Sequence, residues 1–434
     1  MDFQLVIVCS FFLIIFIITY KYVKKNGIIK LGSLILITYT FSVFCSIYLV
    51  NDPLFTHFHD ITIMPYIYWL VMFLIICQPF FIYDKLQINI VKYNIKIIKI
   101  ICIVGFLVSV IPFYEQLIHA REFITSANIA EKIADTHDYR SDTDIEVFLS
   151  PLGQALLHIV NGLFNVAILF IYPLIKGKEK NKLVWLGLAL VVLTANFQSL
   201  LYASRGKATD TIFKFSLFIC LFYPMMEKKL KKNLIKIVGF IGGIIVVLFL
   251  IISLSRTAQY QEHNSQYSSI HHFAHYIGEG TLLFNENLPH LKQHTNGDYC
   301  FYYVKMLVET EPKALTRESR IYFENYLGIK MMVFYTFLGF FVIDIGWIGT
   351  FLFWSIVAFL MCYFLRRSVK TKYSISNDST TNRVRIIRLS DMYIIFLFTS
   401  LILNGFTVYQ FSFSKSFAYF HYLAMYIVLR IFKM

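Results

Sequence analysis

Long apolar segments constrain this chain more than any other feature. Eleven segments of about 16 to 24 residues hold few charged side chains, and a helix needs ~20 apolar residues to cross the hydrocarbon core of a bilayer. Charged residues make up 15% of the 434 residues, against about 25% in soluble domains. The sequence therefore excludes a soluble protein and predicts an all-α integral membrane protein with about eleven transmembrane helices. The expected spans are residues 3–20, 31–50, 63–83, 97–114, 152–175, 183–203, 208–226, 237–254, 346–365, 391–409 and 417–432.

The distribution of basic residues predicts how these spans are oriented. Lys and Arg are concentrated in alternate connecting segments, which hold 26 of the 40 basic residues: residues 21–30, 84–99, 176–182, 227–236, 366–388 and 430–433. Positively charged loops stay in the cytoplasm, so the N-terminus is expected outside and the C-terminus in the cytoplasm. The net charge of +14 thus follows from topology, and no nucleic acid is expected as a partner. All 12 histidines lie outside the basic segments, which favours the outer face as the side with chemistry.

The chain is expected to form a single polytopic membrane domain over residues 1–434, with two long outer loops. Residues 115–150 are acidic and polar, and residues 255–329 form a much longer segment. Loops of this length usually have structure and function of their own. We expect the second loop to consist of short helices that cap the outer mouth of a membrane cavity.

Residues 331–365 are too long for one span and too short for two. This segment has one charge, Asp344, and its 35 residues would make a helix of ~52 Å, against a hydrocarbon core of ~30 Å. The flanking loops require an odd number of crossings. We therefore predict that residues 331–344 enter from outside or lie in the interface, and that the region of Gly346 and Gly349 begins the true span.

Two cations stand at a tight outer turn, where the topological bias disfavours them. Arg205 and Lys207 flank Gly206, which permits a left-handed turn or the close approach of a ligand. The span expected to start at Ala208 offers free N–H groups to an anion, and an Arg beside them suits pyrophosphate. In the alternative interpretation, both side chains only extend to lipid headgroups.

Other outer cations extend this interpretation. Arg256 follows a span directly, and Arg317 and Arg320 stand near the end of the large loop, so with Arg205 they would form an anion-binding pocket. Each could instead contact a headgroup. Asp210 and Lys214 are four residues apart in one span, a spacing that also allows them simply to pair with each other.

The segment SSIHHFAHYIGEG carries the candidate acid–base residues. His271, His275 and Glu279 are spaced i, i+4 and i+8, so on a helix they share one face. His275 or Glu279 could act as a general base on a sugar hydroxyl; a metal site is the weaker alternative, because the HExxH spacing is absent, so no metal and no cofactor are expected. Otherwise these residues are polar loop residues.

Several stretches together resemble the Wzy-type oligosaccharide repeat-unit polymerases, a group related to the O-antigen ligases. The resemblance rests on the many-spanning layout, the SRG turn at Ser204, Arg205 and Gly206, the large late outer loop and the FLGFFVIDIGWIG stretch with Asp344. It implies a metal-independent, membrane-embedded glycosyltransferase on the outer face of the bacterial cytoplasmic membrane. Such an enzyme joins undecaprenyl-pyrophosphate-linked repeat units into surface polysaccharide.

The resemblance also implies site roles and partners. Outer arginines hold pyrophosphate in that family, a role transferred to Arg205 and, on weaker grounds, to Arg256, Arg317 and Arg320, while Ser204, Gly206 and Lys207 are expected to contact substrate. The expected partners are a lipid-linked oligosaccharide donor and acceptor and membrane lipids, with a chain-length regulator and a flippase as further candidates. Two alternatives stay open: an O-antigen ligase, and a non-enzymatic flippase or transporter of lipid-linked glycan.

Overall fold

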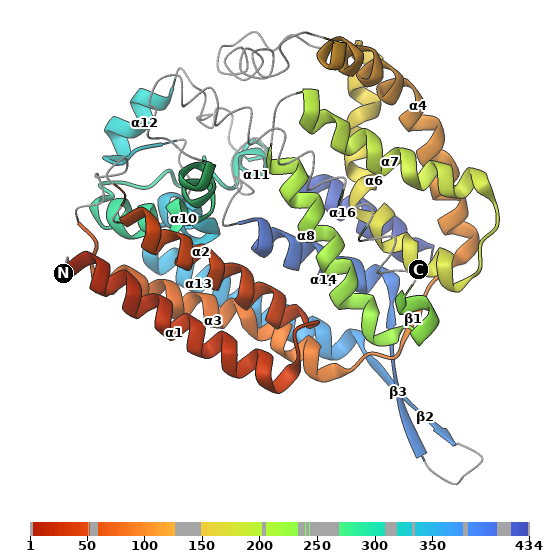
Figure 1. Cartoon of the computed structure of the whole chain (residues 1–434), viewed down its shortest axis with the longest axis horizontal. Helices are drawn as coiled ribbons and strands as arrows, with labels where there is room; N and C mark the ends of the chain where they lie inside the picture. Colours follow the sequence, from red (N-terminus) through yellow and green to blue (C-terminus); the bar gives the residue numbers. More distant parts are fainter. Residues whose placement is uncertain are drawn as a thin grey trace. The chain divides into compact units, whose positions relative to one another are not determined.

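The fold was obtained as a computed structural model. It describes residues 3–50, 52, 60–125, 149–201, 205–232, 239, 243, 269–308, 319–331, 335–375, 381–405 and 418–432. These residues are mainly helical (Figure 1). Among these residues, six helical segments are long and apolar enough to cross a membrane, as a helical membrane protein requires: Phe3–Asn26, Leu31–Val50, Ile63–Leu86, Ile95–His119, Pro151–Lys176 and Thr336–Ser368. The count of eleven spans and their orientation stay predictions.

The chain divides into two compact units. Unit 1 comprises residues 1–88, 270–385 and 401–421, and unit 2 comprises residues 89–269, 386–400 and 422–434. Whether they form the single membrane domain expected from the sequence stays a prediction.

Four long helices dominate unit 1. They are α1 (Phe3–Asn26), α2 (Leu31–Val50), α3 (Ile63–Leu86) and α13 (Thr336–Ser368). In Figure 1, α1 packs against α2 and α3 against α13. Each of these helices is apolar along most of its length, and α1, α2 and α3 also contact one another. Together they bury a shared core that contains Tyr39, Trp69 and Phe73.

Asp84, near the end of α3, fixes the turn between α1 and α2. Its carboxylate accepts hydrogen bonds from the backbone N–H groups of Leu31 (3.0 Å) and Gly32 (2.9 Å) and from the Tyr22 hydroxyl (2.8 Å). The first N–H groups of a helix have no partner within the helix. One buried carboxylate therefore caps α2 and joins three helices.

α13 is interrupted at Gly346. This residue has φ 75° and ψ 174°, so one helical segment stops there and a second continues to Ser368. A positive φ suits glycine and strains other residues, and a Cβ at this position would lie 2.8 Å from Nε2 of His294. The break coincides with the predicted start of the true span, while the depth of the preceding segment in a membrane stays a prediction.

Asp344, two residues before the break, is fully buried. Its carboxylate accepts hydrogen bonds from the backbone N–H groups of Gly297 (2.8 Å), Tyr299 (3.2 Å) and Cys300 (3.0 Å), and from the hydroxyl of Thr295. A buried charge is tolerated only when it is paired or hydrogen bonded. Residues 295–300 are thereby fastened to α13.

The long segment 255–329 contains a larger helix than we expected. α10 (Ser269–Asn287) has 19 residues, and residues 277–285 are all buried, because small and apolar side chains let it enter the core of unit 1. The short elements that follow do fit the expectation of short helices: η3 (Leu288–His290), α11 (Tyr302–Lys305) and α12 (Arg320–Leu327).

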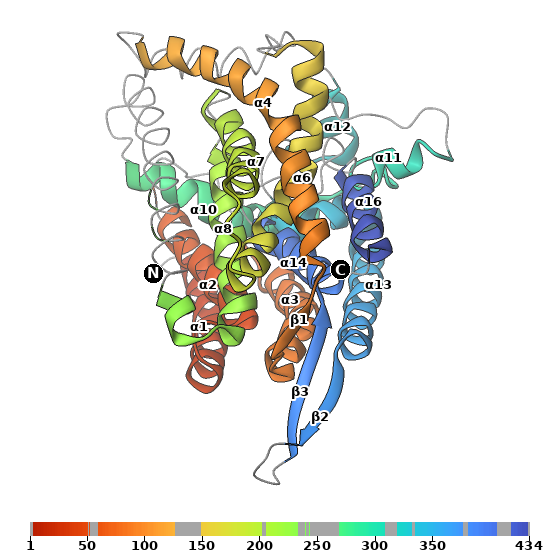
Figure 2. The ribbon, with the colours of Figure 1, turned by 90° about the vertical axis from the view of Figure 1, so that its right-hand side faces the viewer.

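Unit 2 is built on α4 (Ile95–Thr125), α6 (Pro151–Lys176), α7 (Lys182–Leu201) and α8 (Arg205–Phe222), with η2 (Tyr223–Met225) after α8. α4 packs closely on α7, and α6 contacts both (Figure 2). A Cβ at Gly187 of α7 would lie 2.0 Å from the carbonyl oxygen of Cys102 in α4. Glycine is therefore required for this close approach. The unit also contains residues of α14 (Leu389–Asn404) and α16 (Ala418–Ile431), where Arg430 Nη1 lies 2.9 Å from Asp391 Oδ1.

The two charges inside α8 pair with each other. Lys214 Nζ lies 2.5 Å from Asp210 Oδ2, and both residues are buried. The ammonium group also lies 4.7 Å from the ring centroid of Phe164, and the neighbouring Thr211 hydroxyl hydrogen bonds to Asn196 Oδ1 (2.6 Å). Of the two interpretations of these charges, pairing is confirmed.

One small sheet was not expected. β1 (Ile90–Lys92), β3 (Thr381–Arg388) and β2 (Lys370–Ile375) form three strands in the order β1-β3-β2. β1 runs parallel to β3, with Val91 opposite Ile387. The apolar blocks that the structure describes are helical as predicted, while the expected span 237–254 lies almost entirely outside the described residues. β-Branched residues in two basic connecting segments favour the strands.

We predict that Gly346→Ala destabilises the protein by about 1–3 kcal/mol, because a residue with Cβ is strained at positive φ and would clash with His294. Gly349→Ala is the matched control, since this glycine lies in regular helix and Ala favours helix by ~1 kcal/mol. Melting temperatures of the purified variants in detergent check this. Equal stability of the two variants would contradict the strained break.

Candidate functional site

The structure places the predicted site residues in different parts of the chain. Arg205, Gly206 and Lys207 form the first turn of α8, which begins at Arg205 rather than at Ala208 as expected. Arg320 begins α12. For these four residues the structure describes only the backbone, and Ser204, Arg256 and Arg317 lie outside the described residues.

α10 positions the predicted acid–base residues by packing directly on α2. Ser42 and Ser46 of α2 donate hydrogen bonds to the carbonyl oxygens of Ile277 and Gly278, both at 2.7 Å. A Cβ at Gly278 would lie 2.6 Å from the backbone nitrogen of Ser46. The small residue therefore lets the two helices approach until their backbones are nearly in contact.

The end of α10 is also fixed. Asn285 accepts a hydrogen bond from the Thr62 N–H (2.8 Å) and donates one to the Thr62 carbonyl (2.7 Å). Phe284 contacts the ring of Trp347, and the Trp347 carbonyl accepts a hydrogen bond from the Tyr68 hydroxyl (2.7 Å). α10 is thus held at both the α3 and the α13 side, and its first turns carry the polar groups.

His275 and Glu279 lie together one turn apart on α10. His275 Nε2 is 3.2 Å from Glu279 Oε1, and the two side chains are 32% and 10% exposed. The carboxylate is thus almost buried, while the imidazole is partly exposed. The sequence pattern left open which of the two residues could be a base, and the geometry favours His275 as the accessible group with Glu279 orienting it.

A second histidine–carboxylate pair lies one helical turn earlier, and the sequence did not predict it. His271 Nε2 is 2.9 Å from Asp52 Oδ2, whose side chain is 2% exposed. The Tyr48 hydroxyl is hydrogen bonded to the same carboxylate, and the Tyr48 ring packs edge-on against His271. The helical spacing of His271 and His275 was visible in the sequence, but nothing in it linked Asp52 to them.

This arrangement can move a proton. A half-exposed imidazole that is oriented by a buried carboxylate is a common form of general base, because the carboxylate fixes the ring and stabilises the protonated form. In the described parts of the chain, no group of three or more His, Cys, Asp or Glu side chains has the geometry to hold a metal ion.

Comparisons with protein-family models, with curated proteins and with solved structures found no match to this chain. The resemblance to repeat-unit polymerases therefore rests on short motifs and on layout.

We predict that Gly278→Ala displaces α10 from α2 and costs about 1–3 kcal/mol of stability, as expected for overpacking a tight contact. Ile270→Ala, on the same helix but at a side chain that is 67% exposed, should change stability by no more than about 0.5 kcal/mol. Thermal unfolding in detergent compares the two. If the Gly278→Ala variant has the same melting temperature as the wild type, α10 does not approach α2 as closely as described.

Proposed function

We propose that this protein is a membrane-embedded glycosyltransferase that joins lipid-pyrophosphate-linked oligosaccharide repeat units into a surface polysaccharide, with His275 as the general base. The observation that carries the proposal is the His275–Glu279 pair on α10, in which the exposed imidazole is held by a nearly buried carboxylate. The membrane-spanning helices support a substrate that is itself anchored in the bilayer.

The proposed reaction needs few groups from the protein. His275 takes the proton of an acceptor sugar hydroxyl while the hydroxyl oxygen bonds to the anomeric carbon of the donor. The bond from that carbon to the pyrophosphate oxygen breaks, and its electrons leave with the pyrophosphate. Negative charge then grows on the leaving group, where oriented cations stabilise it without reorganisation.

The proposal assigns these cations to Arg205, Arg256, Arg317 and Arg320, with Ser204, Gly206 and Lys207 near the substrate. The assignment of Arg205 is the best supported, because this residue lies in the first turn of α8. The free N–H groups and the dipole at a helix N-terminus favour an anion. The active site would face outward from the bacterial cytoplasmic membrane.

We expect His275→Gln to abolish long polysaccharide chains, because loss of a general base lowers rates by about 10²- to 10⁴-fold. Glu279→Gln should shorten the chains less severely, since the imidazole stays but loses its orienting charge. His290→Gln is the control, because this side chain is 61% exposed and takes no part in the proposed step. Gels of surface glycans from a deletion strain complemented with each variant give the readout; a normal ladder with His275→Gln would remove this residue from the mechanism.

Arg205 is tested by the same assay with Arg205→Ala and Arg205→Lys. We expect the Ala variant to lose long chains and the Lys variant to retain part of the activity, because lysine keeps the charge but not the bidentate geometry. The species that accumulates separates the alternatives. Single repeat units on the carrier indicate a polymerase, long chains on the carrier indicate a ligase, and absence of repeat units from the outer face indicates a flippase.

A further inference from the structure

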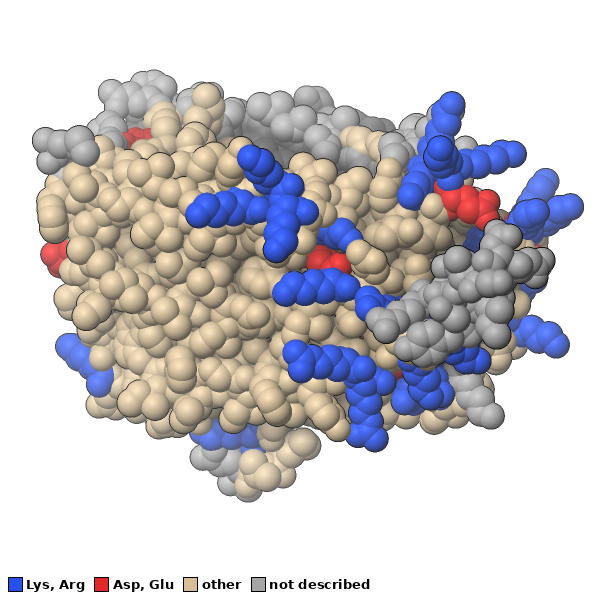
Figure 3. Space-filling model, turned by 90° about the horizontal axis from the view of Figure 1, so that it is seen from below, with Lys and Arg blue, Asp and Glu red and all other residues tan. Residues whose placement is uncertain are grey.

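A corner of unit 2 combines a basic turn with an exposed apolar helix face. The turn between α6 and α7 carries Lys176, Lys178, Lys180 and Lys182, and the start of α4 adds Lys96 and Lys99. Basic side chains also outnumber acidic ones on the face of the molecule drawn in Figure 3. This corner is distinct from the α10 site and takes no part in the proposed reaction.

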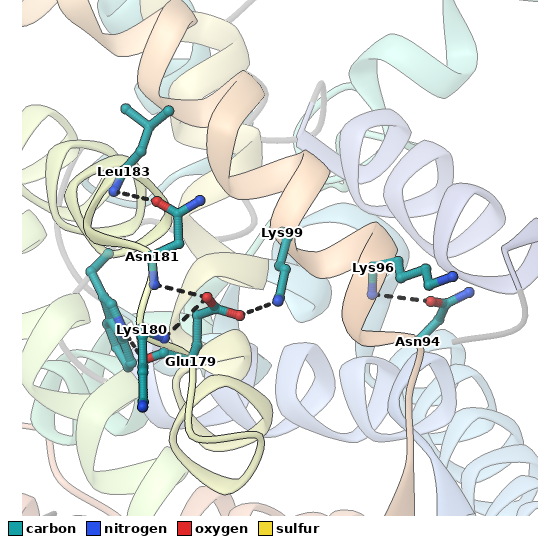
Figure 4. Close-up of polar contacts among 8 residues, drawn as sticks. Asn94, Lys96, Lys99, Glu179, Lys180, Asn181 and Leu183 are labelled. Carbon is teal, nitrogen blue, oxygen red and sulfur yellow. Dashed lines mark hydrogen bonds and ion pairs between the residues drawn. The ribbon is translucent and has the colours of Figure 1, made fainter.

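Glu179 is the one acidic residue of the turn, and its carboxylate contacts a lysine and two backbone N–H groups (Figure 4). Its carboxylate pairs with Lys99 and accepts hydrogen bonds from the backbone N–H groups of Asn181 (2.8 Å) and Lys180 (3.1 Å). These contacts, with Lys99 first, lower the pKa of Glu179 below its ordinary value. The carboxylate therefore orders the turn and neutralises Lys99.

Three lysines of the turn remain available to an anion. Among the described residues, no acidic side chain lies within ion-pair distance of Lys178, Lys180 or Lys182, whereas the Lys176 ammonium lies 5.5 Å from the centroid of the Tyr172 ring. They cluster where α7 begins, and α7 is capped there by Asn181, which accepts from the Leu183 N–H (3.0 Å).

An open apolar face of α7 starts beside Lys182. It consists of Leu183, Trp185, Leu186 and Ala189, which lie on one side of the helix. The Trp185 indole N–H donates a hydrogen bond to the Glu179 carbonyl (3.1 Å), so its ring is fixed between the basic turn and the apolar stripe. Trp at this position is typical of a membrane interface.

The length of the stripe fits one leaflet. Leu183, Leu186 and Leu193 are 40%, 49% and 44% exposed, and the helix from Lys182 to Leu193 is about 16 Å long at 1.5 Å per residue. Half of a hydrocarbon core of ~30 Å is close to this value.

From these observations we infer that the α6–α7 turn and the adjoining face of α7 form a binding site for an anionic phospholipid. The phosphate lies among Lys178, Lys180 and Lys182, and an acyl chain lies along the apolar face of α7 past Trp185. Anionic lipid is favoured over zwitterionic lipid because the turn has a local excess of positive charge, with each lysine near a membrane surface contributing about 1 kcal/mol.

Quenching of tryptophan fluorescence by brominated lipids tests the site in the full-length protein. The protein in detergent is titrated with brominated phosphatidylglycerol or brominated phosphatidylcholine, and the Trp185 contribution is taken as the difference from Trp185→Phe. We expect phosphatidylglycerol to quench Trp185 at an at least about tenfold lower concentration. Equal quenching by both lipids would overturn the proposal.

Two comparisons locate the effect. Lys178→Gln/Lys180→Gln/Lys182→Gln should abolish the preference for phosphatidylglycerol, while the equally charged control Lys21→Gln/Lys24→Gln/Lys25→Gln, at the end of α1, should retain it. Equal losses in both variants would show a diffuse charge effect and overturn the site. If the triple variant does not fold, salt serves on the wild type: raising NaCl to about 1 M should remove the preference by screening, and an unchanged preference would contradict it.

Discussion

The buried carboxylate of Asp344 is the interaction on which the geometry of unit 1 depends. It has no exposure to solvent, and its hydrogen bonds come from residues 295–300, which lie far from it in sequence. Breaking a buried polar network strands an uncompensated charge, at a cost of about 3–5 kcal/mol, so this turn cannot leave α13 easily. His294, just before this turn, lies against Gly346, and η3, which ends four residues earlier at His290, also contacts α13. Because η3 follows α10 directly, the Asp344 network adds to the contacts with α2 and Thr62 that hold α10.

Much of the helical framework could be predicted because the information is local. α2 was expected at residues 31–50 and is observed there, and α6 and α7 begin and end within two residues of expectation, since an apolar run ends where lysines begin. The break at Gly346 followed from the excess length of its segment and from the presence of a glycine. The small sheet could not be predicted in this way: its strands are short and charged, and the pairing of Val91 with Ile387 joins residues far apart in the sequence.

In the candidate site, too, the local contacts could be predicted from the sequence and the long-range contacts could not. Contact between His275 and Glu279 follows from helical spacing alone, and the sequence pattern found it. The contacts that decide which group is buried are not local: Gly278 approaches Ser46, and His271 meets Asp52, across more than two hundred residues. A single sequence carries no signal for such pairs. For the same reason, the spacing of Asp210 and Lys214 left two interpretations open until their distance was known.

The treatment of charge within the helices bears on the choice between enzyme and transporter. A charged group inside a membrane helix costs free energy, and a transport pathway keeps some such groups available to its cargo. In the described helices, Asp84 and Asp344 are committed to backbone N–H groups, and Lys214 is committed to Asp210. Such groups serve the fold. His275 differs, because its imidazole is partly exposed while the carboxylate beside it is not. These contacts, seen in the described helices, support our proposal of chemistry at one site over passage of a polar headgroup between the helices.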